Sequence, residues 1–158
     1  MFIETRGAEE TRLIAEIFGK HLAPQTLILF YGDLGAGKTL FTQGIGKALG
    51  IARMKSPSFI IASEYPDTTP PLLHVDLYRL ATEREIDSLE IEDYLADGFA
   101  VCVEWSENWQ NVPQDHIKIE IKKTGETTRC ITCSACGEKH KKILQDIKEE
   151  LANDYIIH

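Results

Sequence analysis

Residues 32–39, Gly-Asp-Leu-Gly-Ala-Gly-Lys-Thr, constrain this chain more than any other stretch. They match the phosphate-loop pattern, in which four residues separate two glycines, and a lysine and a hydroxyl residue follow the second glycine. The glycines allow the backbone to curl so that successive N–H groups face phosphate oxygens, while Lys38 supplies a positive charge and Thr39 a hydroxyl ligand for magnesium. The stretch therefore predicts a site for a nucleoside triphosphate.

The residues on either side of this loop have the pattern that such a site requires. Residues 26–31 are apolar and predict a buried strand that leads into the loop, and residues 40–49 can form a helix that ends near Gly50. Strand, loop and helix is the order of a phosphate-loop unit, and the start of the helix adds the positive end of its dipole beneath the phosphates. A glycine-rich turn that only connects a strand to a helix is the alternative, but such a turn has no need for Lys-Thr after its last glycine.

The length and composition fit one cytoplasmic domain. With 158 residues and 43% hydrophobic content, residues 1–158 are expected to form a single core. No run approaches the roughly 18 apolar residues of a membrane span, and the amino terminus lacks the basic and apolar regions of a signal peptide, so we expect no membrane partner. The net charge of −8 and the pI near 5.1 argue against autonomous binding to nucleic acid, which needs Lys and Arg to neutralise phosphates. Any RNA would be reached through a partner protein.

The four cysteines raise the question of a zinc site. Cys130, Cys133 and Cys136, followed by His140, have spacings that superficially resemble those of zinc ligands. The three cysteines, however, lie in a segment with the pattern of one extended strand, in which Cys130 and Cys133 point to opposite faces and cannot share a metal without a bend. We therefore expect reduced cysteines, no zinc and no disulfides, with Cys102 in the core.

Periodicities along the rest of the chain predict further strands and helices. They indicate an opening strand at 2–4, an amphipathic helix at 8–22, a strand at 60–65, short helices between 82 and 95, a hairpin of residues 115–122 and 128–135, and a last helix at 138–151. Thr82 and Glu85 match a capping box at the start of a helix. Together with the phosphate-loop unit, this order predicts an α/β, three-layer phosphate-loop NTPase fold with a largely parallel central sheet and a C-terminal antiparallel hairpin.

Two apolar segments end in carboxylates. Residues 72–76 end at Asp76, and residues 99–104 end at Glu104. Acids at the carboxyl ends of strands beside a phosphate loop can position magnesium. Glu104 would be either a further metal ligand or the group that positions the attacking water. His74 is either a ligand or a hydrogen-bonded structural residue.

Two more segments have open roles. Residues 56–59, Ser-Pro-Ser-Phe, lie one helix after the phosphate loop, where many nucleotide hydrolases have a segment that senses the terminal phosphate. A plain turn set by Pro57 explains the composition equally well. Trp105 and Trp109 follow Glu104, and they either cover the core or belong to the site.

Taken together, these motifs resemble the TsaE (YjeE) family of small bacterial ATPases over residues 10–137. The resemblance is carried by the phosphate loop with its Gln-Gly at 43–44, Ser-Pro-Ser-Phe at 56–59, His-Val-Asp-Leu-Tyr-Arg at 74–79 and Val-Glu-Trp at 103–105. It implies an ATPase that uses ATP and Mg²⁺ and supports threonylcarbamoyl-adenosine (t6A) modification of tRNA next to the anticodon, acting with the TsaD and TsaB proteins. The modification chemistry would belong to TsaD, and tRNA would be reached only through the complex.

The resemblance also implies roles for individual residues. Lys38, Asp76 and Glu104 would be catalytic, and Thr39, Asp76 and Glu104 would hold magnesium. The ATP-binding set would comprise the loop and one residue of an amino-terminal Glu-Thr pair near the base: Asp33, Leu34, Gly35, Ala36, Gly37, Lys38, Thr39, Leu40 and Thr11. The family's Pro-Thr-Phe segment appears here as Pro-Ser-Phe at 57–59, which keeps a hydroxyl and is compatible with a switch.

Two alternative functions, a small-molecule kinase and a guanine-nucleotide switch, would require sequence features that an ATPase does not. A small-molecule kinase needs cations around the transferred phosphoryl group and usually a mobile lid, but the six arginines are scattered and no insertion resembles a lid. A guanine-nucleotide switch without productive turnover would carry an Asn-Lys-x-Asp motif, which the chain lacks.

Arg79 and Arg53 are the candidates within the chain for an activating arginine. Otherwise a partner would supply one or would order residues 56–59, and hydrolysis by the isolated protein would be slow.

Overall fold

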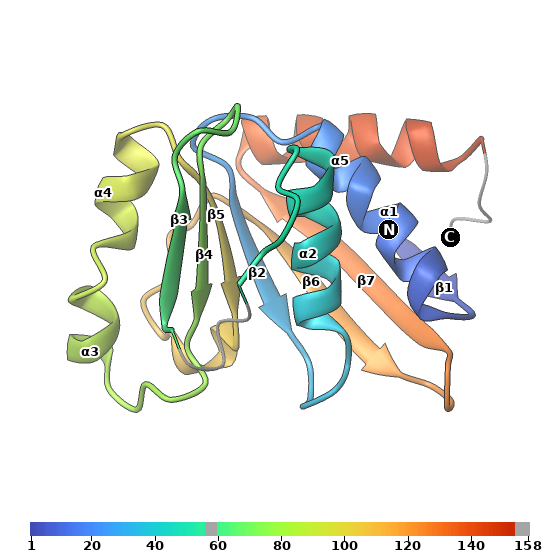
Figure 1. The fold of residues 1–158 in the computed structure, drawn as a ribbon, viewed down its shortest axis with the longest axis horizontal. Helices are drawn as coiled ribbons and strands as arrows, with labels where there is room; N and C mark the ends of the chain where they lie inside the picture. Colours follow the sequence, from blue (N-terminus) through green and yellow to red (C-terminus); the bar gives the residue numbers. More distant parts are fainter. Residues whose placement is uncertain (56–59, 154–158) are drawn as a thin grey trace.

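Strand β2 (Leu27–Tyr31) is the middle strand of a seven-stranded sheet and leads into the phosphate loop (Figure 1). The computed structural model describes residues 1–55 and 60–153. The other elements, in chain order, are β1 (Phe2–Thr5), α1 (Ala8–Lys20), α2 (Lys38–Ala48), β3 (Ala62–Tyr65), β4 (Leu72–Asp76), α3 (Glu83–Asp87), α4 (Ile91–Ala96), β5 (Ala100–Glu104), the 3₁₀ helix η1 (Ser106–Asn108), β6 (His116–Lys123), β7 (Arg129–Cys136) and α5 (Glu138–Leu151).

The sheet is parallel at its centre and antiparallel at both edges. Its strand order is β1-β7-β6-β2-β5-β4-β3, and β6, β2, β5 and β4 run parallel to one another. At one edge, β7 pairs antiparallel with β6, and β1 pairs antiparallel with β7. At the other edge, β3 pairs antiparallel with β4. The predicted parallel centre and C-terminal hairpin are confirmed, and the sheet as a whole is mixed. Because β5 lies next to β2, the end of β5 lies beside the phosphate loop.

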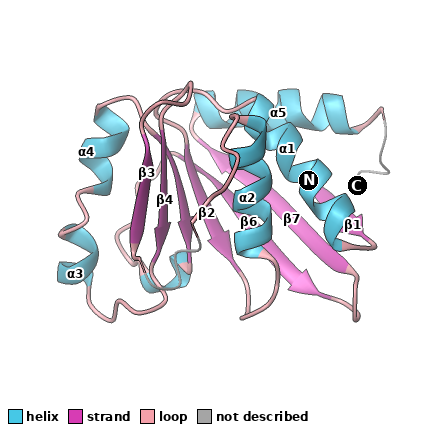
Figure 2. Ribbon diagram, viewed as in Figure 1, coloured by secondary structure: helices cyan, strands magenta, loops and turns pink. Residues whose placement is uncertain are grey.

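Helices cover the two faces of the sheet. Ile28 and Phe30 of β2 pack in one apolar cluster with residues of α1, α2 and α5, whereas Leu27 and Leu29 pack in another with residues of α3 and α4. This alternation follows from the period of two in a strand, and burial on both faces explains why β2 is apolar throughout. Figure 2 shows α1 and α2 in front of the sheet, and α3 and α4 beside β3.

Most element boundaries agree with the sequence, and the differences are small. β4 and α5 have the predicted bounds. α2 begins at Lys38, two residues before its predicted start, because Gly37 in a left-handed conformation (φ 115°) is its N-cap. α1 ends at Lys20 instead of residue 22, and β3 begins at Ala62 instead of residue 60. The candidate switch at residues 56–59 lies outside the described residues.

The crossover from β4 to β5 contains the two predicted short helices. The Thr82 hydroxyl accepts the Glu85 backbone N–H at 3.3 Å, and the Glu85 carboxylate accepts the Thr82 backbone N–H at 3.0 Å. The predicted capping box is therefore present at the start of α3.

The cysteine-rich segment is one extended strand, as predicted. Cys133 of β7 lies in the core with 2% of its surface exposed, whereas Cys130 is half-buried on the opposite face. Cys102 is fully buried, which confirms its place in the core. Within residues 1–55 and 60–153, no group of three or more His, Cys, Asp or Glu side chains is arranged to hold a metal ion. In the same part of the chain, no helix has the length and apolar character needed to cross a membrane.

Candidate functional site

The phosphate loop has the backbone conformation for which its glycines are suited. Gly32 (φ 140°) packs so closely on β6 that a Cβ at this position would clash with the carbonyl oxygen of Ile121. Gly37 (φ 115°) reverses the chain at the start of α2. Both positions therefore require glycine, and the turn places the loop at the positive end of α2.

Lys38 is nearly buried beneath the loop, with 4% of its surface exposed. Its ammonium group donates to the carbonyl oxygens of Gly32 and of Asp33, the latter at 3.1 Å. It also lies 3.8 Å from the centre of the Trp105 ring. Burial lowers the pKa of Lys38, although nearby carboxylates act in the opposite direction. In the described contacts, the Lys38 ammonium group therefore donates hydrogen bonds to neutral carbonyl oxygens.

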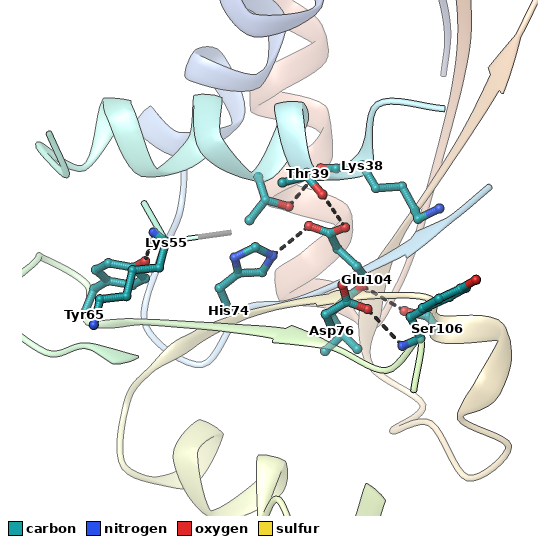
Figure 3. A network of polar contacts seen from close by, with 11 residues as sticks. Lys38, Thr39, Lys55, Tyr65, His74, Asp76, Glu104 and Ser106 are labelled. Carbon is teal, nitrogen blue, oxygen red and sulfur yellow. Dashed lines mark hydrogen bonds and ion pairs between the residues drawn. The ribbon is translucent and has the colours of Figure 1, made fainter. Parts of the chain in front are cut away.

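A chain of hydrogen bonds connects α2, β5 and β4 at the site (Figure 3). The Thr39 hydroxyl donates to Oε2 of Glu104 at 2.9 Å, and Oε1 of Glu104 lies 2.7 Å from Nε2 of His74. Glu104 is 1% exposed and His74 is fully buried. His74 is therefore a hydrogen-bonded residue that orients Glu104, which is one of the two roles that the sequence left open.

Asp76 lies opposite Glu104 in the parallel register of β4 and β5. Its Oδ1 accepts the backbone N–H of Tyr78 at 2.9 Å. Burial raises the pKa of Asp76, the Tyr78 N–H lowers it in part, and the neighbouring Glu104 raises it again. The two neighbouring carboxylates repel each other, and a bound cation would offset this repulsion.

The donor atoms at this site suit magnesium bound together with a phosphate chain. Thr39, Asp76 and Glu104 provide hydroxyl and carboxylate oxygens. Mg²⁺ prefers oxygen ligands and typically takes one or two from protein carboxylates, with phosphate oxygens and waters completing its shell. Two carboxylates and a hydroxyl therefore fit the ion in the presence of a nucleotide.

These side chains border a cavity of about 410 Å³. It lies at the carboxyl ends of β4 and β5, which is where parallel α/β sheets bind ligands, and its volume is in the range of small-molecule sites. Tyr78 and Trp105 form an aromatic wall with ring centroids 4.7 Å apart. The complete lining is Leu34, Gly35, Ala36, Gly37, Lys38, Thr39, Leu40, Ile61, Asp76, Tyr78, Arg79, Glu104 and Trp105.

Most of the predicted site residues meet at this cavity, but three candidates do not line it. Asp33 belongs to the loop, where its carbonyl accepts the Ala36 N–H at 3.0 Å, but it is not part of the cavity wall. The buried Thr11 hydroxyl lies 2.7 Å from that of Thr5, so the geometry gives no support for Thr11 near a bound base. Arg53 lines a separate groove.

The structure decides between the two roles left open for the tryptophans and adds residues to the site: Trp105 lines the cavity, whereas Trp109 packs in the core. Trp105 (φ 58°) and Tyr78 wall the cavity, and the signal for both was their position beside the acids that end β5 and β4. Arg129 at the start of β7 donates its Nε–H to the carbonyl oxygen of Ala36 at 2.8 Å. No motif marks Arg129, since 93 positions separate it from Ala36.

Comparison with known proteins gives a consistent result. The family model for the threonylcarbamoyl adenosine biosynthesis protein TsaE matches residues 5–131. A Bacillus subtilis (strain 168) protein named tRNA threonylcarbamoyladenosine biosynthesis protein TsaE is 38% identical over 146 residues, which cover 90% of each chain. A protein of the same name from Nostoc sp. (strain PCC 7120) is 38% identical over 127 residues, or 77% of each chain. The crystal structure of B. subtilis YdiB matches with a TM-score of 0.82 and 32% identity over 95% of both chains.

Proposed function

The chain belongs to the TsaE family of threonylcarbamoyl adenosine biosynthesis proteins, and from that premise we propose that it is a cytoplasmic, Mg²⁺-dependent ATPase with slow intrinsic turnover. In this proposal it supports t6A modification of tRNA together with TsaD and TsaB, and it reaches tRNA only through that complex. The observation that carries the proposal is the convergence of Lys38, Thr39, Asp76 and Glu104 on one cavity beside a phosphate loop.

The loop and Lys38 would bind the phosphate chain of ATP. Backbone N–H groups of the loop and the start of α2 can donate to phosphate oxygens. Lys38 would exchange its carbonyl acceptors for phosphate, because a charged acceptor forms the stronger hydrogen bond with an ammonium group. The rings of Tyr78 and Trp105 would shield this contact from water.

Thr39 and Asp76 would hold magnesium, which neutralises the charge on the phosphate oxygens during phosphoryl transfer. Asp76 can offer Oδ2, since its Oδ1 accepts the Tyr78 N–H. Thr39 can offer a lone pair of its hydroxyl oxygen while its proton stays in the hydrogen bond to Glu104. The hydrogen bonds of Asp76 and Thr39 are therefore compatible with a bound magnesium ion.

Glu104 would orient the attacking water. Its two carboxylate oxygens contact Thr39 and His74, so the carboxylate is held in one orientation from both sides. A water-positioning group needs such a fixed direction. A ligand role for Glu104 is the alternative, and mutation separates the two.

The first test compares ATP binding with turnover in four variants. Thr39→Ala and Asp76→Ala should each weaken ATP binding about tenfold or more in Mg²⁺ and much less in EDTA, because each removes a metal ligand. Glu104→Gln should keep the affinity within a few-fold and lower kcat about a hundredfold. Asp67→Asn, an exposed acid in the turn before β4 and thus at its opposite end, is the matched control. Equal loss of Mg²⁺-dependent binding in all three site variants would make Glu104 a ligand.

The second test measures steady-state ATPase activity while the TsaD–TsaB pair is titrated in. Arg79 lines the cavity within this chain, and we propose that the pair adds a further cation or orders residues 56–59 over the terminal phosphate. An arginine supplied by a partner raises turnover by roughly a thousandfold or more in other phosphate-loop enzymes. Rapid turnover in isolation that the pair leaves unchanged would contradict the coupled ATPase and favour a small-molecule kinase.

A further inference from the structure

Arg129 joins the phosphate loop to the turn of the β6–β7 hairpin. Its Nε–H donates to the carbonyl oxygen of Ala36 at 2.8 Å, and its Nη2 donates to that of Gly35 at 3.4 Å. On the other side, its Nη1 donates to the carbonyl oxygens of Thr128 at 2.9 Å and Gly125 at 3.5 Å. One guanidinium group therefore bridges two adjacent peptides of the loop and two carbonyls of the hairpin turn.

We propose that Arg129 is a positioning residue for nucleotide binding, which holds the phosphate loop in its phosphate-binding conformation from outside the cavity. The proposal rests on the ATP-binding function argued above. Arg129 does not belong to the lining of the cavity, so it acts through the loop backbone and not by touching the nucleotide.

Peptide geometry explains how this contact reaches the cavity. In a trans peptide the C=O and N–H point in opposite directions. Anchoring the carbonyl of Ala36 therefore fixes the direction of the Gly37 N–H, and Gly37 lines the cavity at the start of α2. Anchoring the carbonyl of Gly35 fixes the Ala36 N–H, which itself donates to Asp33 at 3.0 Å. Arg129, which comes from β7 of the sheet, thus holds two successive peptides of the loop.

Ala36 packs in the core with 2% of its surface exposed, but Asp33, Leu34 and Gly35 before it are exposed, so packing holds only part of the tip of the loop and an anchor is needed for the rest. The loop glycines have positive φ, and glycine loses more conformational freedom on ordering than any other residue. Gly32 is wedged against β6, but a Cβ at Gly35 or Gly37 would meet no atom within 4 Å. Leu34, between them and Gly32, is 78% exposed. A loop fixed in advance binds more tightly because it does not have to be ordered by its ligand.

The affinity experiment compares Arg129→Ala, Arg129→Lys and Lys123→Ala. Lys123 pairs with Arg129 across β6 and β7 and is exposed, so its truncation removes the same charge from the same hairpin without a described contact to the loop. By calorimetric titration of ADP and ATP, Arg129→Ala should bind about tenfold to a hundredfold more weakly, while Lys123→Ala stays within about twofold. Arg129→Lys should recover only part of the loss, because an ammonium group lacks the fork that reaches both carbonyls. Turnover at saturating ATP should stay near that of the wild type in Lys123→Ala, whereas the loss in Arg129→Ala should appear mainly as a higher KM for ATP.

A second measurement needs no nucleotide. Amide hydrogen exchange at residues 34–38 of the nucleotide-free protein should be faster in Arg129→Ala than in the wild type, and unchanged in Lys123→Ala. Circular dichroism at the assay temperature checks that the variants are folded, so that a difference confined to these amides reports on the loop.

The outcomes are distinguishable. If the wild type binds neither nucleotide, the proposed function fails and this inference fails with it. If the wild type binds and Arg129→Ala matches it in affinity and exchange, only the inference is overturned. Equal losses in Arg129→Ala and Lys123→Ala, or full recovery in Arg129→Lys, would show a general effect of positive charge and would also overturn it.

Discussion

We expect His140 to make the stability of this fold depend on pH. It lies near the start of α5 with 4% of its surface exposed, and its Nε2 accepts the backbone N–H of Leu27, the first residue of β2, at 3.1 Å. A ring nitrogen can accept this bond only while it is unprotonated. Burial lowers the pKa of His140; Lys139 and His116 also lower it, and Asp115 opposes them. Protonation would therefore break the contact that fixes the entrance to the phosphate-loop strand.

The sign and size of the effect follow from linkage. Because the folded protein takes up this proton less readily than the unfolded chain, the contribution is fully present above the unfolded pKa of about 6.5 and is lost as the pH falls below it. The slope cannot exceed about 1.4 kcal/mol per pH unit and approaches this limit only below about pH 6.5, so between pH 7.5 and pH 5.5 the loss is up to about 1.4 kcal/mol. For a chain of this size that corresponds to a fall in Tm of about 3–6 °C.

The assay is urea unfolding of the wild type and His140→Gln at both pH values. A glutamine carbonyl can still accept the Leu27 N–H but does not titrate, so the variant should lack this part of the pH dependence. His140→Ala should in addition lose about 1–3 kcal/mol at pH 7.5, because a buried N–H is left without an acceptor. If His140→Gln and the wild type lose equal stability between the two pH values, the reasoning is refuted.

The remaining predictions concern the aromatic wall and the cysteines. ATP should change the tryptophan fluorescence of the wild type, and Trp105→Phe should abolish this change while Trp109→Phe keeps it, because Trp105 lines the cavity and Trp109 is only 6% exposed in the core. Cys130 and Cys136 should react with a maleimide before Cys133, since the first two are half-buried and burial raises the pKa of the Cys133 thiol to about 12. Protein purified without added metal should contain no stoichiometric zinc; a one-to-one zinc content by mass spectrometry would contradict our interpretation of the β7 cysteines.

The parts of this fold that could be predicted are those determined by residues close together in the sequence. The strand, loop and helix around Lys38 follow from a short motif and its apolar flanks, and β4 could be delimited because an apolar run lies between Pro71 and a carboxylate. Thr11 shows the limit of this reasoning. A hydroxyl near the amino terminus carries no sign of which neighbour it will meet, and the structure pairs it with Thr5. Arg129 is a second case, since its partners are backbone carbonyls, which leave no mark in the sequence.

Part of the hydrogen-bond network of Thr39, Glu104 and His74 follows from the alternation of side chains in the two neighbouring strands. A strand has a period of two, so His74 and Asp76 share one face of β4, and Cys102 and Glu104 share one face of β5. Cys102 packs in the cluster that contains residues of α2, which identifies this face as the one that α2 covers. In the parallel register His74 lies opposite Cys102, and Asp76 lies opposite Glu104. Thr39 at the start of α2 then meets Glu104, and His74 can reach the same carboxylate from the neighbouring strand. The pattern His-x-Asp on one strand and Cys-x-Glu on the next thus places these side chains on one face of each strand, but the pairing register of the two strands and the identity of the helix above that face come only from the structure.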